Sequence, residues 1–173
     1  MPELPEVEVV KRSLEKYIKN LTIKSIRIKP KKLRYIIDKK KLKKTVGKKI
    51  ISIKRRSKYL LLNLNNNQTI LVHLGMTGKF FIIDKKKERK KTSFYYNLNS
   101  KDKKHNHLIF KLNNNIRLIY NDVRKFGFVK VILSNGLKNN SHLKLLGPEP
   151  FSKKFNINYI EKYVINKNKS LKD

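Results

Sequence analysis

The feature that most constrains the fold of this chain is a series of short segments rich in β-forming residues, separated by asparagine and glycine turns. Asparagine runs at 65–67 and 113–115 would each reverse the chain and make a hairpin. Eight or so short strands after one helix indicate a mainly β fold, specifically a two-layer β-sandwich. Eight strands are predicted at residues 22–29, 50–54, 59–64, 69–74, 79–83, 107–112, 116–120 and 126–133, and the segments 33–37 and 94–98 are candidates for two more.

Two kinds of segment lie outside these strands. Residues 39–44, 84–92 and 99–104 are so polar or charged that we predict solvated loops there. The first twenty residues are different, because apolar residues recur there at three- and four-residue spacing and Pro5 suits a first helical turn. We predict one amphipathic helix over about residues 5–20, with its apolar face formed by Val7, Val10, Leu14, Ile18 and Leu21.

The residues in front of this helix offer a nucleophile. Removal of Met1 would leave Pro2 first in the chain, with a free secondary amine. An α-amino group titrates at about 7.7–8.0, and the positive end of a helix dipole would lower that pKa further. Addition of a secondary amine to an aldehyde or an anomeric carbon gives a cationic iminium, which is an electron sink for elimination.

Two carboxyl groups lie within a turn of that amine. We predict that one of Glu3 and Glu6 is a general acid on a sugar ring oxygen, and that the other positions groups or shuttles a proton. The plain alternative is that these acids only cap the helix at the positive end of its dipole.

The chain is strongly basic. It has 44 Lys and Arg against 12 Asp and Glu, which gives a formal net charge of +32. Such a chain will bind polyanions, of which nucleic acid is the obvious one. Lysine, asparagine and isoleucine share A/T-rich codons, however, so a biased genome explains the excess equally well, and the charge does not locate a site.

Composition also narrows the class of protein. The chain has no cysteine, so disulfides and thiolate metal sites are excluded, and its four histidines lack metal-ligand spacing. No apolar run approaches the roughly 18 residues of a membrane span, and an acidic, helical N-terminus is unlike a signal peptide. We therefore expect a cytoplasmic monomer with no metal and no membrane contact.

Three segments between strands carry more specific signals. Residues 55–58 form a basic cluster directly before an apolar strand, for which a charged strand end is the plain alternative. Met76 lies between two glycines, which is not how core residues are placed, although methionine beside a turn is also common. The loop 121–127 offers a guanidinium at Arg124 and an aromatic plane at Phe126, which suit an orphaned base and its neighbouring stack.

The opening Met-Pro-Glu-Leu-Pro-Glu-Val-Glu closely resembles that of the bacterial formamidopyrimidine-DNA glycosylases. These are base-excision repair enzymes whose N-terminal proline attacks the sugar of an oxidised purine. Leu4 and Val7 favour this family over its sister, endonuclease VIII. The resemblance implies a two-layer sandwich flanked by helices, and it makes Pro2 the nucleophile.

The same resemblance assigns roles in DNA binding. Arg-Arg-x-Lys-Tyr-Leu-Leu places a phosphate-contacting lysine, next to the nucleophile, at Lys58, where a second cation would also lower the amine pKa. In His-Leu-Gly-Met-Thr-Gly, His73 matches a histidine that contacts the DNA backbone, and Met76 matches a methionine that enters the space left by the flipped nucleotide. A soft apolar side chain suits such a gap in the stack.

The loop 121–127 resembles the family's Asp-Pro-Arg-Arg-Phe-Gly. Arg124 matches the arginine that pairs with the estranged cytosine, and Phe126 matches the intercalating wedge. Val123 replaces a proline, which loosens the loop, and Lys125 replaces an arginine, which keeps the charge but loses the planar fork. More weakly, His105 with its neighbour His107 matches a pair near the DNA backbone.

Gly147-Pro148-Glu149-Pro150 marks a boundary, after which Asn158 to Asn166 looks helical. The resemblance implies a catalytic domain over 1–147 and, over 148–173, the junction and first helix of a helix-two-turn-helix domain. The family's remaining helices and four-cysteine zinc finger have no counterpart here, so we expect no cofactor in this chain. Without the family's phosphate-gripping asparagine and arginine, we expect affinity to fall by several powers of ten.

The resemblance thus implies a DNA glycosylase with apurinic/apyrimidinic lyase activity on 8-oxoguanine and formamidopyrimidine. It would act through a Schiff base and β,δ-elimination on double-stranded DNA that holds an oxidised base or an abasic site. One alternative is an inactive remnant that binds nucleic acid without chemistry. Another is a lysine-rich, non-catalytic nucleic-acid-binding protein of the ribosomal kind, which would need no methionine or phenylalanine wedge.

Overall fold

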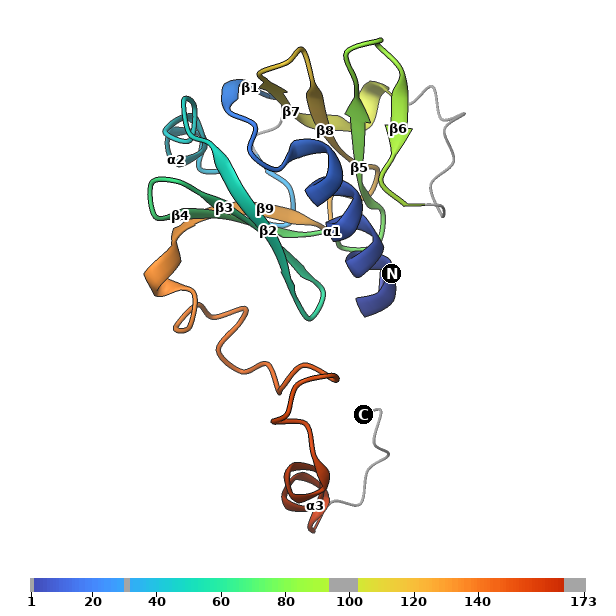
Figure 1. Ribbon diagram of the computed structural model, residues 1–173, viewed down its shortest axis with the longest axis vertical. Helices are drawn as coiled ribbons and strands as arrows, with labels where there is room; N and C mark the ends of the chain where they lie inside the picture. The colour runs from blue at the N-terminus through green and yellow to red at the C-terminus, as the bar shows by residue number, and fades with distance from the viewer. Residues whose placement is uncertain (1, 30–31, 94–102, 167–173) are drawn as a thin grey trace.

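The computed structural model describes residues 2–29, 32–93 and 103–166. Within them lie three α-helices, nine β-strands and two short 3-10 turns (Figure 1). The helices are α1 (Leu4–Ile18), α2 (Lys39–Lys43) and α3 (Ile157–Val164). The strands are β1 (Ile23–Ile28), β2 (Ile50–Arg56), β3 (Tyr59–Leu64), β4 (Gln68–His73), β5 (Gly78–Ile83), β6 (Arg89–Lys91), β7 (Asn106–Leu112), β8 (Arg117–Asp122) and β9 (Phe128–Leu133).

The strands form two antiparallel sheets. One has the order β1-β7-β8-β5-β6 and the other the order β2-β3-β4-β9. The two asparagine turns close the β3–β4 and β7–β8 hairpins as predicted. The predicted mainly β, two-layer sandwich with an N-terminal helix is confirmed.

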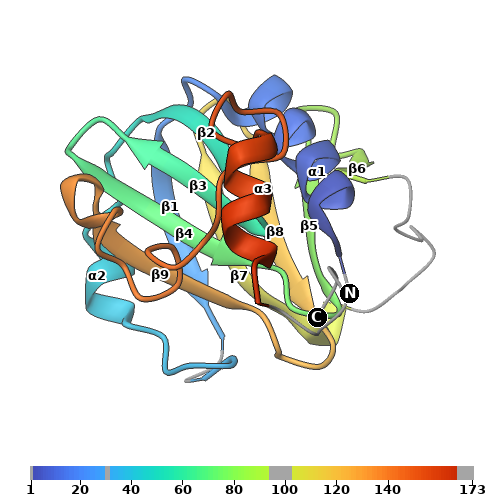
Figure 2. The ribbon, with the colours of Figure 1, turned by 90° about the horizontal axis from the view of Figure 1, so that it is seen from below.

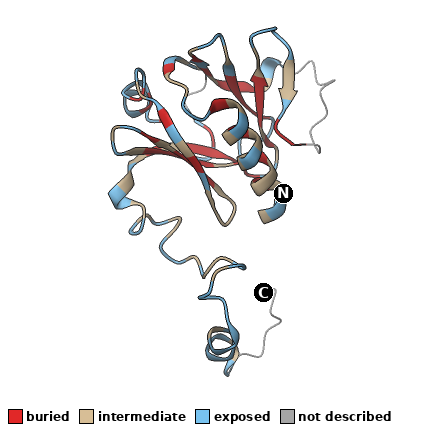
Figure 3. Cartoon of the chain, in the orientation of Figure 1, coloured by how far each residue is buried: buried red, intermediate tan, exposed pale blue. Residues whose placement is uncertain are grey.

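The main core fills the space between the sheets and under α1 (Figure 3), and Leu61, Leu71 and Phe128 form a second, smaller cluster. The apolar face of α1 packs on β2, and its four inward residues Val7, Val10, Leu14 and Ile18 are completely buried. Strands β3, β4, β5 and β8 are buried over most of their length. The loop between β4 and β5 and the loop between β8 and β9 each begin at the end of a buried strand. The core therefore fixes the starting point of each loop.

Three expectations about local structure are wrong. Residues 33–37 form a tight turn instead of a strand, because the side chains of Leu33 and Ile37, at the two ends of the turn, are both buried in the core. The lysine-rich segment 39–44 contains α2, which Asp38 caps by accepting a hydrogen bond from the Lys41 N–H at 2.9 Å. The charged segment 84–92 includes the edge strand β6. The predicted strand 94–98 and most of the loop 99–104 lie outside the described residues.

The region after β9 is built differently. A short 3-10 turn (Ser134–Gly136) is followed by irregular chain over 137–156, and α3 confirms the predicted helix at 158–166 to within a few residues. Figure 1 shows α3 apart from both sheets, and Figure 2, seen from below, places it in front of the strands. Its Ile157 and Tyr163 are 71% and 67% exposed. No helix among the described residues is long and apolar enough to cross a membrane.

Candidate functional site

The residues predicted around the amine come together. Pro2 directly precedes the helix cap Glu3, whose backbone N–H donates to Glu6 Oε2 at 3.0 Å. The other end of Glu3 reaches the β2–β3 turn, where its Oε2 lies 2.6 Å from Lys58 Nζ. The capping that was the plain alternative is therefore present, and it holds Pro2 beside a carboxylate–ammonium pair. We call Pro2, Glu3, Glu6 and Lys58 the amine end.

The β2–β3 turn consists of two residues, Ser57 and Lys58. Ser57 has a φ of 50°, a left-handed conformation that costs a residue other than glycine about 1–2 kcal/mol. Neighbouring charges hold it there. Glu149 Oε1 accepts from the Ser57 N–H at 2.7 Å, and Arg55 Nη1 donates to the Ser57 carbonyl at 3.1 Å.

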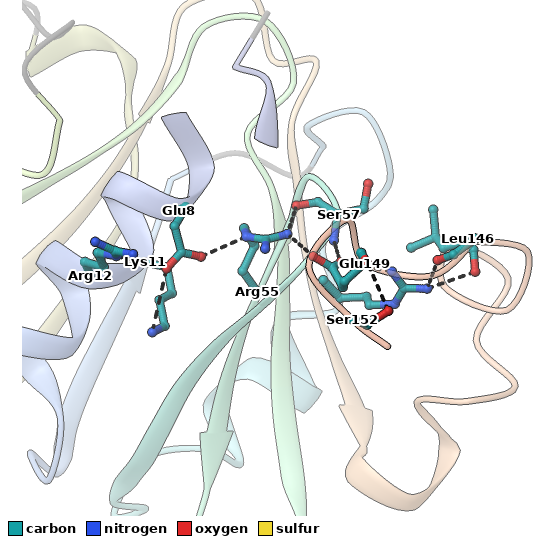
Figure 4. Close-up of polar contacts among 10 residues, drawn as sticks. Glu8, Lys11, Arg12, Arg55, Ser57, Leu146, Glu149 and Ser152 are labelled. Atoms are coloured by element: carbon teal, nitrogen blue, oxygen red, sulfur yellow. Dashed lines mark hydrogen bonds and ion pairs between the residues drawn. The ribbon is translucent and has the colours of Figure 1, made fainter. Parts of the chain in front are cut away.

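These contacts belong to a wider charge network (Figure 4). Arg55 bridges Glu8 of α1 and Glu149, with nitrogen–oxygen distances of 2.8 and 2.7 Å. Burial by itself would raise the pKa of Glu8, but hydrogen bonds from Arg55 and Arg12 outweigh burial and hold that pKa below its ordinary value. The pKa of Glu149 is lowered in the same way, against burial, by Ser57, Arg56 and Arg55. Both carboxylates are therefore ionised near neutral pH.

His73 connects the amine end to the rest of the site. It ends β4 opposite Tyr59, the residue after Lys58. Burial lowers the pKa of His73, and the nearby charges of Arg34 and Lys58 lower it further, so the ring is neutral near pH 7. Because the Gly75 N–H donates to its Nδ1 at 3.1 Å, the neutral ring carries its proton on Nε2, which is then the donor it can offer to a phosphate.

Beyond His73 the surface is hollowed. A groove of about 610 Å³ is lined by Leu33, Arg34, His73, Gly75, Met76, Arg124, Lys125 and Phe126. Met76 and Phe126 are 42% and 45% exposed, although both are large and apolar. The Arg124 guanidinium lies 4.4 Å from the centre of the Phe126 ring. The structure thus brings four predicted DNA-binding residues, His73, Met76, Arg124 and Phe126, into one groove.

A buried carboxylate, Asp122, holds the two loops of this groove. Its Oδ1 accepts from Thr77 Oγ1 at 2.5 Å, and Thr77 in turn accepts from the Arg124 N–H at 3.0 Å. Its Oδ2 accepts from the Gly127 N–H at 2.8 Å and from Tyr120 Oη at 3.3 Å. Since Asp122 is completely buried at the end of β8, the loop before β5 and the loop before β9 are fixed to the same point of the core.

Glycine lets these two loops touch. Gly75 has a φ of 63°, and a Cβ there would lie 2.5 Å from the Gly127 nitrogen. A Cβ on Gly127 would lie 1.9 Å from Tyr120 Oη and 2.6 Å from the His73 carbonyl oxygen. Any side chain at these positions would push the loops apart, and Met76 and Phe126 with them.

His105 does not line the groove. It ends the 3-10 turn Lys103–His105, with its ring centre 6.5 Å from that of His107. His107 is buried, and its Nε2 lies 2.7 Å from the Asp122 carbonyl oxygen. Burial lowers the pKa of His107 although the hydrogen bond to Asp122 opposes that shift. His107 thus supports β8, and the predicted role of His105 at the DNA backbone stays a prediction.

Residue patterns missed three members of this arrangement. Arg34 lines the groove, and its backbone N–H donates to the Gly127 carbonyl at 3.1 Å, yet 33–37 was expected to be a strand. In the sequence, Asp122 stands out only as the second residue of the 121–127 loop motif. Glu149 was interpreted only as part of a boundary, although an acid between two prolines stands out in a chain with 12 acids.

No group of three or more His, Cys, Asp or Glu that could hold a metal ion occurs in the described part of the chain. The groups that the structure does bring together here are an amine, two carboxyl groups and a cation, beside a basic groove with exposed apolar side chains.

Comparison with known proteins agrees with this arrangement. The profile of the formamidopyrimidine-DNA glycosylase N-terminal domain matches residues 1–129. Formamidopyrimidine-DNA glycosylases from Rhodopseudomonas palustris (strain ATCC BAA-98 / CGA009) and Bartonella tribocorum are 36% and 39% identical over 172 and 176 residues. Each alignment covers 99% of this chain and 59% of the relative.

Solved structures show the same likeness. The chain superposes on the Lactococcus lactis Fpg in complex with an abasic site containing DNA with a TM-score of 0.80 and 33% identity, over 99% of this chain and 59% of that one. A complex of that protein with an N7-benzyl-Fapy-dG containing DNA gives 0.77 and 34%, over 95% and 56%.

The chain spans about 59% of the length of these curated relatives. The matched part contains the amine end and both loops of the groove. Because the family profile matches well over half of its residues, the chain belongs to the formamidopyrimidine-DNA glycosylase family.

Proposed function

We propose that this chain carries the catalytic amine and the DNA-facing groove of a base-excision repair glycosylase with apurinic/apyrimidinic lyase activity. Its substrate would be double-stranded DNA with an oxidised purine or an abasic site, which it would meet in the cytoplasm as a monomer. The observation that carries the proposal is the Glu3–Lys58 pair at 2.6 Å directly beside Pro2, in a chain of this family.

The proposed chemistry begins at the sugar. The Pro2 nitrogen attacks C1′, the bond to the base breaks, and the base leaves with that electron pair and takes up a proton. Protonation of the ring oxygen by Glu3 or Glu6 opens the sugar and gives the iminium. Loss of a C2′ proton then expels the 3′ phosphate, a second elimination expels the 5′ phosphate, and water releases the sugar fragment.

The other residues would act on the DNA. Lys58 would contact the phosphate next to the flipped nucleotide, which frees the Glu3 carboxyl group for proton transfer. Met76 would fill the gap in the stack, Phe126 would wedge beside it, and Arg124 would pair with the opposite base. His73 and His105 would contact the backbone. This chain by itself should react more readily with an exposed abasic aldehyde, which needs mainly the amine, than with an oxidised base stacked in a duplex.

Borohydride trapping on an oligonucleotide with one abasic site tests the proposal. The chain with Met1 removed should form a covalent adduct, and a variant with one extra N-terminal residue should form none. Pro2→Gly replaces the secondary amine with a primary amine and should trap more slowly. An adduct that persists after the extension would point to a lysine instead. No adduct from the folded chain, with equal and strongly salt-dependent affinity for damaged and intact DNA, would favour a non-catalytic nucleic-acid-binding protein.

A further inference from the structure

Glu149 connects the junction 146–150 to the turn that carries Lys58. One of its oxygens accepts from the Ser57 N–H at 2.7 Å and from Arg56 Nη1 at 2.9 Å, and the other lies 2.7 Å from Arg55 Nη1. The same Arg56 donates from Nη2 to the carbonyls of Leu146, at 2.8 Å, and Gly147 (Figure 4). The junction is therefore held to this turn by side-chain and backbone contacts together.

These contacts fix the residue that determines where Lys58 points. Ser57 is left-handed, and both of its backbone polar groups are engaged by the network, the N–H by Glu149 and the carbonyl by Arg55. In a two-residue turn the backbone of the first residue sets the direction of the second. If the Ser57 N–H lost its charged acceptor, the turn would lose a hydrogen bond that stabilises the strained left-handed conformation of Ser57.

The junction also meets the start of α1. A small cavity of about 180 Å³ is lined by Leu4, Arg56, Ser57 and the junction residues Leu146, Gly147, Pro148, Glu149 and Pro150. Leu4 directly follows Glu3, the partner of Lys58. Three segments far apart in sequence, the helix start, the turn and the junction, thus converge next to the amine end.

We propose that Glu149 is a positioning residue for Lys58, and through the Lys58–Glu3 pair for the amine end as a whole. This inference rests on the proposed function, which it deepens by making the junction a support of the reaction centre. Glu8 cannot replace Glu149, because its one contact with β2 or the β2–β3 turn, among the described residues, is with Arg55, and it lies on the opposite side of that guanidinium (Figure 4). The effect of Glu149 must therefore pass through Ser57 and Lys58.

Glu149→Gln tests this inference, since glutamine keeps the shape and removes the charge. The matched control is Glu161→Gln, which makes the same charge change at an exposed position of α3. Single-turnover borohydride trapping is measured at saturating protein and across pH, together with the affinity for abasic-site DNA and the free energy of unfolding in urea.

We expect the trapping rate of Glu149→Gln to fall about tenfold or more with affinity nearly unchanged, because a misplaced group costs rate more than binding. The acid limb of its pH profile should move to higher pH, since an ammonium held near the amine favours the neutral amine. In a Lys58→Met background the Glu149 substitution should have no further effect. Glu161→Gln should behave as wild type.

A second readout does not need activity. The side-chain ammonium resonance of Lys58, assigned by its loss in Lys58→Met, should be sharp in wild type and in Glu161→Gln and exchange-broadened in Glu149→Gln. If the wild-type chain forms no adduct, the proposed function fails while this resonance still decides on Glu149. If Glu149→Gln does not fold, Glu149→Asp, which withdraws the carboxylate but keeps the charge, takes its place. The inference would be overturned if Glu149→Gln changed neither the trapping rate nor the Lys58 resonance. It would also be overturned if Glu149→Gln lowered the trapping rate equally in the wild-type and Lys58→Met backgrounds.

Discussion

The amine end and the groove are adjacent parts of one candidate site, but different forces hold them. At the amine end, Glu3 is 56% exposed and its contact with Lys58 is an ion pair, while the turn beneath depends on Arg55 and Glu149. In the groove, a completely buried Asp122 and two glycines in backbone contact hold the loops. The amine end is thus held by charge interactions, and the groove is held by close backbone packing at two glycines and by buried hydrogen bonds.

This difference matches what each part would have to do. A group that transfers protons and contacts a phosphate must exchange partners during the reaction, and exposed ion pairs exchange partners at little cost. A wedge that enters a base stack must not move, and side chains on loops fixed to a packed core keep their position. Substitutions of the buried residues and glycines that hold the groove loops should therefore affect folding stability more than substitutions at the amine end.

The largest effect is expected from Asp122→Ala. It removes the acceptor of three hydrogen bonds and leaves the Gly127 N–H and the Tyr120 hydroxyl without their charged partner, so we expect a loss of about 3 kcal/mol in the free energy of unfolding. Asp122→Asn is the matched variant. Its oxygen can serve Gly127 and Tyr120, and its amide can donate to Thr77 Oγ1, so urea unfolding should show less than half of that loss. Equal losses would show that the charge, not the hydrogen bonds, holds the loops.

Gly127→Ala should come next. The new Cβ would lie 1.9 Å from Tyr120 Oη and 2.6 Å from a backbone oxygen, so the loop must shift, at a cost of about 1–3 kcal/mol. Gly136→Ala is the control, because a Cβ there has no neighbour within 4 Å. Thermal unfolding compares the two, and binding to abasic-site duplex should weaken only in Gly127→Ala. A stable, tightly binding Gly127→Ala protein would contradict the close packing of the loops.

The sandwich could be predicted from sequence because its signals are local. Strand segments and asparagine turns repeat along the chain, and the apolar spacing of α1 is visible within 15 residues. The α2 helix escaped prediction because it depends on one capping carboxylate, Asp38, and one buried side chain, Leu42, in a segment of lysines. Residues 33–37 were mistaken because buried apolar residues at the ends of a turn look like strand residues.

The site was predictable only in part. Its loops were found from motifs, and the residues that the motifs contain, such as Met76 and Arg124, do meet in one groove. The supports were not found because their partners are remote in sequence. Glu149 and Ser57 are 92 residues apart, and the Arg34 backbone bonds to Gly127. Pairing over such distances has no local pattern, so it emerges only when both partners are placed by the fold.

Arg55→Met tests the charge-dependent part with an intermediate effect. The lowered pKa values of Glu8 and Glu149 stabilise the fold above the ordinary carboxyl value of 4.5, and that stabilisation disappears as pH falls through the lowered values. We expect Arg55→Met to be less stable than wild type by about 1 kcal/mol at pH 7, and we expect this deficit to shrink steadily as the pH falls below 4.5.

The control for Arg55→Met is Arg12→Met, which removes a 77% exposed partner of the same Glu8. Its effect should be smaller at every pH, and added salt should remove it first. Urea unfolding at several pH values measures both variants. A deficit in Arg55→Met that persists unchanged at low pH would mean that the guanidinium acts through packing and not through its charge.

Met76→Ala should have the smallest effect on stability and still separate the two parts of the site. Met76 is 42% exposed, so its loss should change the free energy of unfolding by less than about 0.5 kcal/mol, as should Ile51→Ala at 44% exposure on the far face of β2. Trapping should respond differently. A gap in a base stack exists only in a duplex, so Met76→Ala should slow trapping on double-stranded abasic DNA but leave the single-stranded substrate unaffected. Equal slowing on both substrates would show that Met76 supports the amine end instead of the stack, and the division between the two parts of the site would then fail.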